Sequence, residues 1–145
     1  SCCSGESPEL TSEWRTVKFA LSSLKMLLVN AQSGPSSIHG MGLIAQELIP
    51  KGTKIWQFMP GFDVAIPAEE VALLSFAAQR TLDYYSYYHE PTRTFVLSAD
   101  DDRFTNHSDT PNTAPLGNNT VAIREILAGE EITVNYNNLC ILNFD

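Results

Sequence analysis

Side chains that can bind or react gather in one polar segment of this chain, residues 103–112. The segment holds amides, hydroxyls, an imidazole and a carboxylate, and Pro111 excludes it from a helix interior or a central strand. Apolar runs at 95–97 and 121–123 flank it and are typical of buried strands. A polar stretch between core strands must satisfy many backbone donors and acceptors, and function is often found there. The segment is therefore the first candidate site, although an ordinary surface loop would explain it equally well if it stood alone.

The spacing of these residues argues against two familiar reactive centres. His107, Ser108 and Asp109 are neighbours in sequence, which is poor geometry for a hydrolytic triad. Glu130 and Glu131 come directly after a glycine in a predicted tight turn, so we expect them to be solvated or salt-bridged. The cysteines are adjacent near one end or alone near the other, which predicts neither a disulfide framework nor a zinc site.

Composition and charge limit the kinds of protein and the kinds of partner that fit this sequence. The 145 residues are 43% hydrophobic and 18% charged, which is typical of one globular domain. The formal net charge of −8 argues against direct binding of nucleic acid and favours cationic partners, although solubility alone also explains it. No apolar run approaches the roughly 20 residues of a membrane helix, so we expect no membrane partner. No leader sequence is recognised, and we expect the protein in the cytoplasm, or in the nucleus if the source is eukaryotic.

The elements that must position the candidate site are mainly short strands. We predict strands at 26–29, 43–45, 55–58, 94–97 and 121–123, and a loop at 30–37 around Gly34 and Pro35. One helix is predicted over 67–83, with Val71, Leu74, Ala78 and Leu82 on its buried face. We expect residues 84–88 to form an aromatic strand or loop, and residues 14–24 fit a helix or a strand equally well. The fold class is therefore mainly β.

Two segments of the chain have similar sequence patterns. Residues 44–55 and 121–132 each have a strand, a tight turn that ends in glycine, and another strand, and Ile49 matches Ile126. The match is too short to establish duplication, but it predicts two similar strand–turn–strand units.

Three motifs in this order resemble those of a SET domain. The first is His39-Gly40-Met41-Gly42-Leu43, with a turn at 49–52 after it. The second is Arg103-Phe104-x-Asn106-His107-Ser108-x-x-Pro111-Asn112, and the third is Gly129-Glu130-Glu131-Ile132-x-x-Asn135-Tyr136. The resemblance covers about residues 25–137. It implies several small curved β-sheets, a C-terminal pseudoknot that threads the second motif beneath the third, and an inserted helix at 67–83 beside the substrate cleft. Residues 1–24 would form an N-terminal arm and 138–145 a short tail.

The resemblance also implies a chemistry, the transfer of a methyl group from S-adenosylmethionine (SAM) to a lysine of a histone or another basic protein segment. Tyr136 would be the catalytic residue at the methyl-transfer pore, and Asn106 would bind the amino group of the cofactor. Arg103 would anchor the second motif or assist on the carboxylate side. The cofactor-binding residues implied are His39, Gly40, Met41, Gly42, Arg103, Asn106, His107, Tyr136 and Phe144. The substrate-binding residues implied are Tyr84, Tyr85, Tyr87, Tyr88 and Phe104, and the resemblance does not choose among the four tyrosines.

The chain departs from the family pattern in three ways. Asp109 replaces a frequent Cys, Asn135 replaces a frequent Asp, and no zinc-binding Cys cluster flanks the motifs. Phe144 could close the cofactor site in place of such a cluster, or a homodimer could supply the missing wall. Two interpretations stay open, an active methyltransferase and a SET-fold module that binds protein and methylates little or nothing.

Overall fold

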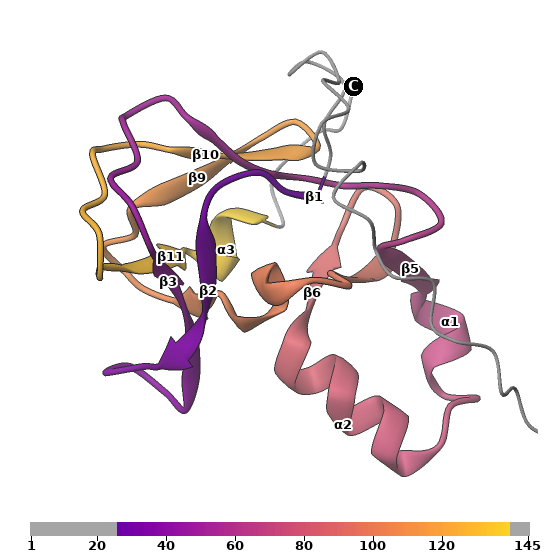
Figure 1. Ribbon diagram of the computed structural model, residues 1–145. Coiled ribbons are helices and arrows are strands. Elements are labelled where there is room, and N and C mark those ends of the chain that lie inside the picture. The colour runs from indigo at the N-terminus through magenta and orange to yellow at the C-terminus, as the bar shows by residue number, and fades with distance from the viewer. Residues whose placement is uncertain (1–25, 140–145) are drawn as a thin grey trace, which may run out of the picture.

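The computed structural model describes residues 26–139, and their fold is mainly β, as predicted, with three small sheets and short helices (Figure 1). Phe144, the arm at 1–24 and most of the predicted tail lie outside the described residues. No helix within 26–139 is long and apolar enough to cross a membrane.

The first sheet has the strand order β1-β4-β10-β9, and all its pairs are antiparallel. Its strands are β1 (Met26–Leu27), β4 (Lys54–Gln57), β9 (Thr113–Leu116) and β10 (Asn119–Ala122). Gly117 turns β9 into β10 at a φ of 62°, a positive value that favours glycine. The predicted strands at 55–58 and 121–123 belong to this sheet.

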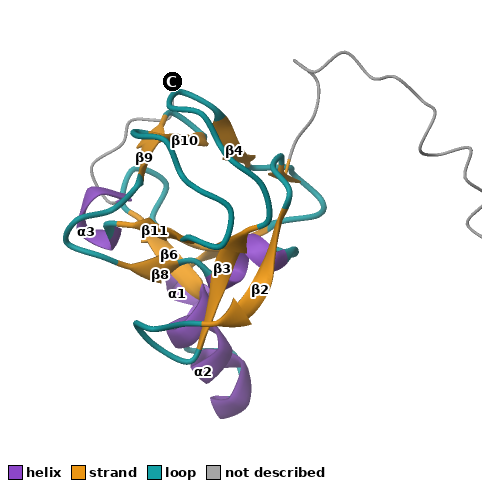
Figure 2. Ribbon diagram, turned by 60° about the vertical axis from the view of Figure 1, so that its left-hand side comes forward, coloured by secondary structure: helices purple, strands orange, loops and turns teal. Residues whose placement is uncertain are grey.

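The second sheet brings the three motifs together. Its order is β2-β3-β11-β8, with β2 (Ala31–Pro35), β3 (Met41–Ala45), β8 (Asn106–His107) and β11 (Glu131–Val134). β8 pairs with β11 in parallel, Thr133 opposite Asn106 and Val134 opposite His107, and the other pairs are antiparallel. This parallel pair lays the second motif alongside the third. The short helix α3 (Tyr136–Leu139) follows β11 (Figure 2).

The predicted loop at 30–37 is wrong, because most of it is strand β2. β2 pairs with β3 along its whole length, and Gly34 lies opposite Gly42. Gly34 and Pro35 are loop signals in the sequence, but β2 is at the edge of its sheet, where a proline without an N–H is tolerated.

The third sheet has the order β5-β7-β6 and carries the helical insert. Its strands are β5 (Val64–Pro67), β6 (Ser86–His89) and β7 (Thr94–Leu97). Between β5 and β6 the chain forms α1 (Ala68–Val71) and α2 (Phe76–Tyr85), and α2 extends away from the two larger sheets in both views (Figure 1, Figure 2).

The single helix predicted over 67–83 is therefore wrong in its extent. The Ser75 hydroxyl accepts a hydrogen bond from the N–H of Ala78 at 3.2 Å, and such a cap begins a new helix. The predicted inner face is nevertheless correct, since Leu82 is buried and Leu74 is half-buried. Residues 84 and 85 end α2, so the expected aromatic strand begins later, in β6.

One apolar cluster joins the first two sheets and β7. Its buried members are Leu43, Ala45, Ile49, Ile55, Trp56, Val96, Ala122, Ile126 and Ile132. Each of the large side chains contributes about 1.5–3 kcal/mol by leaving water. Ile49 and Ile126, the residues matched between the two segments of similar sequence pattern, pair directly: each donates its N–H to the carbonyl of the other, at 2.8 and 2.9 Å.

A run of three aspartates fixes the approach to the second motif. The short 3-10 helix η3 (Asp101–Phe104) leads into β8. Asp100 accepts a hydrogen bond from the N–H of Leu27 at 2.8 Å, and Asp101 accepts one from the N–H of Ser33 at 3.0 Å. These carboxylates attach η3 to β1 and β2, so the first residues of the second motif are held against both larger sheets.

Candidate functional site

A cavity of about 580 Å³, called here the large cavity, lies between α2, the start of β3 and the η3–β8 segment. It is lined by His39, Gly40, Met41, Ala77, Arg80, Thr81, Tyr84, Tyr85, Arg103, Phe104, Thr105 and Asn106. Pockets that bind small molecules have volumes of roughly 300–1,000 Å³. Most residues predicted to bind cofactor, and three predicted to bind substrate, therefore lie around one space of suitable size.

Asn106 holds the rim of this cavity in place. Its Nδ2 group lies 2.8 Å from Glu131 Oε1, 2.9 Å from the Met41 carbonyl oxygen, and 3.1 Å from both the His39 carbonyl oxygen and Ser36 Oγ. Carboxylate and carbonyl oxygens only accept, so these contacts fix which end of the amide faces them. Asn106 thus joins the first motif to the third through a single donor group.

Gly42 is not among the residues that line the large cavity, although the sequence predicts it to bind cofactor. A Cβ at this position would lie 2.2 Å from Glu131 Oε1 and 3.1 Å from the Ser36 Cβ. The absence of a side chain therefore makes room for the Glu131 carboxylate. Ser36 Oγ lies 2.8 Å from both oxygens of that carboxylate and donates to them.

The prediction that both glutamates are solvated or salt-bridged holds for Glu130 but not for Glu131. Glu130 forms an ion pair with Arg124 at 2.8 Å, as expected, and the hydrogen bond from Arg124 lowers the pKa of Glu130. Glu131 is half-buried and belongs to the Asn106 network. The sequence reasoning missed this residue, because its partners Ser36 and Gly42 are far from it along the chain.

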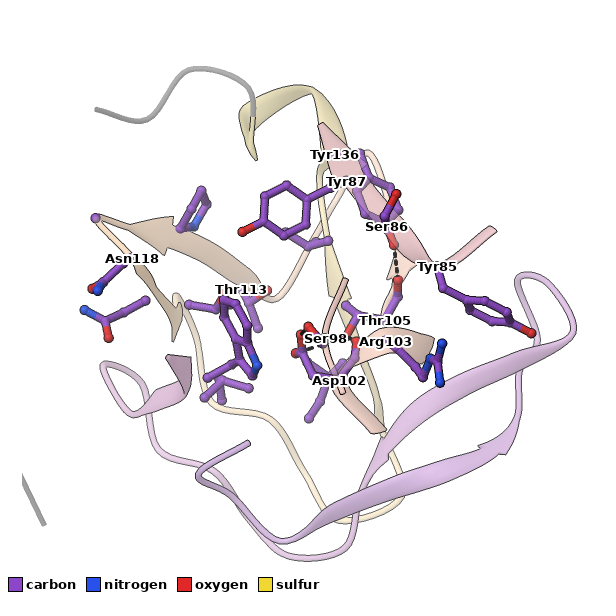
Figure 3. Close-up of a pocket in the computed structure, with 18 residues that line it drawn as sticks. Tyr85, Ser86, Tyr87, Ser98, Asp102, Arg103, Thr105, Thr113, Asn118 and Tyr136 are labelled. Carbon is purple, nitrogen blue, oxygen red and sulfur yellow. Dashed lines mark hydrogen bonds between the residues drawn. The ribbon is translucent and has the colours of Figure 1, made fainter. Parts of the chain in front are cut away.

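A second, narrow cavity of about 50 Å³ is lined in part by residues of the same η3–β8 segment (Figure 3). Tyr136, Tyr87, Ser98 and Asp102 line it, together with core residues of the first two sheets. The Tyr136 hydroxyl donates a hydrogen bond to the carbonyl of Thr105, drawn as a dashed line in Figure 3. The hydroxyl is thus bound one residue before Asn106, but Tyr136 lines the narrow cavity and not the large one.

The two cavities share a wall made by Tyr85, Arg103 and Thr105. The Arg103 guanidinium lies over the Tyr85 ring at 5.0 Å, and Tyr85 meets the Phe104 ring edge-on at 5.6 Å between centroids. Cation–π attraction of this kind holds the guanidinium over the ring. Within residues 26–139 the buried Arg103 Nε has no hydrogen-bond partner.

Burial dominates the electrostatics of the narrow cavity. Burial, with smaller effects of the neighbouring Asp100 and Asp63, raises the pKa of Asp102 to about 7, although hydrogen bonds from Ser98 and Thr105 act in the opposite direction. Burial, with a smaller effect of Asp102, raises the pKa of Tyr136 to about 12. This phenol therefore stays protonated at neutral pH.

Two further predicted residues lie outside both cavities. His107 stacks on the Tyr136 ring at 6.0 Å, accepts the N–H of Tyr136 at its Nδ1, and places its Nε2 3.0 Å from Asp109. This arrangement orients Tyr136 and uses both ring nitrogens. Tyr88 packs on Phe95 at 5.1 Å and lines neither cavity, so the structure gives no support to its predicted place in a substrate channel.

Of the other predicted tyrosines, Tyr84 lines the large cavity, Tyr87 lines the narrow one, and Tyr85 lies between them. Among residues 26–139 no group of three or more His, Cys, Asp or Glu side chains could hold a metal ion.

Comparison with known proteins identifies the architecture. A humanised mutant of the Chaetomium thermophilum Polycomb Repressive Complex 2 superposes with a TM-score of 0.55 at 20% identity, over 79% of this chain and 16% of that chain. A Plasmodium falciparum protein described as a putative histone methyltransferase gives 0.51 at 27% identity, over 74% of this chain and 93% of that one. A search of curated proteins gives no match. The SET domain family model matches residues 40–137, more than half of the sequence, and the chain therefore belongs to the SET domain family.

Proposed function

We propose that this protein transfers a methyl group from SAM to a lysine side chain of a protein, in a histone or another basic segment. The observation that carries the proposal is the shared wall. The large cavity and the narrow cavity meet at Tyr85, Arg103 and Thr105, and the Tyr136 hydroxyl binds the Thr105 carbonyl there. Family membership, and similarity to a protein described as a putative histone methyltransferase, support a methyltransferase.

The large cavity suits the cofactor in its size and in the chemistry of its lining. Arg80 and Arg103 can pair with a carboxylate, and the rings of Tyr84 and Phe104 can pack on an adenine or face a sulfonium. The rim next to Gly40 is open, since a Cβ there would meet nothing within 4 Å. When bound, the cofactor supplies a methyl group activated on a positively charged sulfur.

The narrow cavity suits the end of a lysine side chain. Its volume is about 50 Å³. A space of this size holds roughly three or four water-sized groups, which matches a terminal methylene and amine better than a larger ligand. Because the Tyr136 hydroxyl donates a hydrogen bond to the carbonyl of Thr105, its oxygen has lone-pair directions that can accept from an amine. Two partners held in adjoining cavities that share three lining residues gain mainly from proximity and alignment.

The overall charge of the protein supports a basic substrate. A net charge of −8 raises the encounter rate with a lysine- or arginine-rich segment. The apolar residues Leu73 and Phe76, before and at the start of α2, are 84% and 87% exposed. Such exposure favours protein binding in either interpretation of the fold.

A SET-fold module that only binds protein is therefore the second candidate. The exposed apolar residues at the start of α2 are the observation that favours it. Calorimetry with SAM separates the two candidates, because such a module would bind no cofactor at high micromolar concentration.

The test is transfer of a tritiated methyl group from SAM to core histones and to lysate proteins. Tyr136→Phe should leave the protein folded and lower transfer by more than tenfold, about 1.4 kcal/mol or more of activation free energy. Tyr88→Phe is the matched control, since Tyr88 lines neither cavity, and it should retain wild-type transfer. Undiminished transfer by Tyr136→Phe would refute the assigned role.

A further inference from the structure

The Asp102 carboxylate has no role in the methyl transfer described above. It lies in η3 and lines the narrow cavity with Tyr87 and Tyr136 (Figure 3). Its neighbours Asp100 and Asp101 bind backbone N–H groups of β1 and β2, which explains both of them structurally. Asp102 is the member of the run that lines the narrow cavity, and it needs a different explanation.

The polar contacts of Asp102 leave it able to accept another donor. Ser98 Oγ donates to Oδ2 at 2.8 Å, whereas Thr105 Oγ1 lies 3.5 Å from Oδ1 and bonds mainly to the Asp102 carbonyl, at 2.7 Å. A carboxylate accepts about four hydrogen bonds. Among the described residues, the Asp102 carboxylate receives one short bond and one long one from side chains, so a donor in the cavity would find oxygen lone pairs available.

The charges of the described residues around Asp102 also favour a cationic ligand. A carboxylate removed from water normally has a positive partner, yet no Lys, Arg or His within residues 26–139 forms an ion pair with Asp102. The adjacent Arg103 guanidinium is directed onto the Tyr85 ring. The charged groups that do act on Asp102 are Asp100 and Asp63, both negative.

We propose that the Asp102 carboxylate binds the incoming lysine ammonium in the narrow cavity and accepts one of its protons. The inference rests on the proposed function, since an amine must be neutral before it can attack a methyl group. One N–H bond of the ammonium breaks and its electron pair remains on nitrogen as a lone pair. An O–H bond forms on Asp102, and this proton passes to solvent after the product leaves.

The titration behaviour of the cavity agrees with this role. Burial raises the pKa of Asp102 to about 7, so this carboxylate accepts a proton far more readily than an ordinary one, whose pKa is about 3.9. Burial also lowers the pKa of an amine. The titratable groups that face Asp102 are Asp63 before β5, Asp100 beside η3, Tyr87 in β6 and Tyr136 in α3. Strands β1, β2 and β3, which pack on η3, contain no charged residue.

The first measurement needs no cofactor. We would titrate n-butylammonium, which reproduces the stem and ammonium of lysine, into wild-type protein at pH 8 and follow binding by NMR. Asp102→Asn removes the charge with little change of shape, and Asp101→Asn is the matched control because Asp101 is directed to Ser33. We expect the wild type and Asp101→Asn to bind alike, and Asp102→Asn to bind at least roughly tenfold more weakly. Equal binding by Asp102→Asn would overturn the inference.

The second measurement is the pH profile of methyl transfer to core histones. In the wild type the rate should rise through pH 7 as Asp102 ionises, and Asp102→Asn should lose this rise. A merely structural role would lower the rate without removing the rise, so a retained rise in Asp102→Asn overturns the inference. If the wild type binds n-butylammonium through Asp102 but transfers no methyl group, the proposed function fails while the ammonium site stands.

Discussion

Asn106→Asp tests the geometry of the rim of the large cavity most severely. The substitution replaces the Nδ2 donor by an oxygen and leaves the shape unchanged. That oxygen would face Glu131 Oε1 at 2.8 Å and the Met41 carbonyl at 2.9 Å, both of which are acceptors. These two contacts become repulsive, as does the longer one with the His39 carbonyl, and the contact with Glu131 becomes a pair of like charges.

The magnitude follows from these distances. Losing one bond to a charged acceptor and one to a carbonyl removes roughly 2–4 kcal/mol. The Coulomb repulsion at this separation is about 6 kcal/mol at an effective dielectric constant of about 20, but protonation of one carboxyl relieves it. For a carboxyl with an ordinary pKa of about 4, that protonation costs about 4 kcal/mol at pH 7 and about 1 kcal/mol at pH 5.

The expected destabilisation is therefore strongly dependent on pH. The paired carboxyls have raised pKa values in the folded state, so stability is lost as pH rises above about 4. Compared with wild type, Asn106→Asp should lose roughly 2–3 kcal/mol more of its free energy of unfolding at pH 7 than at pH 5. Urea unfolding at both pH values measures this difference directly.

A second substitution checks the assigned partner. Glu131→Gln in the Asn106→Asp background removes the like charge and supplies an amide donor to the new carboxylate. It should restore most of the pH-dependent part of the loss, while the contacts with His39 and Met41 remain repulsive. The reasoning would be refuted if Asn106→Asp unfolded like wild type at both pH values, or if Glu131→Gln gave no recovery.

Three other substitutions follow from the same contacts. The buried Asn112 amide satisfies the N–H of Thr133 and the carbonyl of Glu131, both at 2.8 Å. Asn112→Ala should therefore remove roughly 2–6 kcal/mol of unfolding free energy, which urea unfolding measures. Gly42→Ala should displace the Glu131 carboxylate and cost roughly 1–3 kcal/mol, which thermal unfolding would detect. Because the pKa of Asp102 is raised in the folded state, the wild type loses stability as pH rises from about 4 to about 7. Asp102→Asn should thus be more stable than wild type by up to about 4 kcal/mol above pH 7, and parallel urea titrations should show this advantage shrinking toward pH 4.

The meeting of the second and third motifs could be predicted because each motif is a short local pattern. The parallel pairing of β8 with β11 brings Asn106 and Tyr136 close together, as the order of the motifs implied. The sequence could not predict which cavity each tyrosine lines, because this depends on where α2 ends and β6 begins. Tyr85 ends α2 and lies at the wall, whereas Tyr87 alternates into the narrow cavity and Tyr88 away from it.

The missed residues have a common physical cause. Glu131 follows a turn and Asp102 stands in a run of aspartates, and both patterns are typical of solvated surface. Their burial comes from contacts distant in sequence, with Ser36 and Asn106 for Glu131, and with Ser98 and the narrow cavity for Asp102. Contacts between residues distant in sequence cannot be predicted from short local sequence patterns.

The most direct test of methyl transfer between the two adjoining cavities is the position of the transferred group. Core histones incubated with the protein and with SAM carrying a deuterated methyl group would be digested and sequenced by mass spectrometry. The account predicts the label on lysine side-chain nitrogens with the wild type and a strongly reduced yield with Tyr136→Phe. No label, label on other residues, or equal labelling by Tyr136→Phe would contradict it.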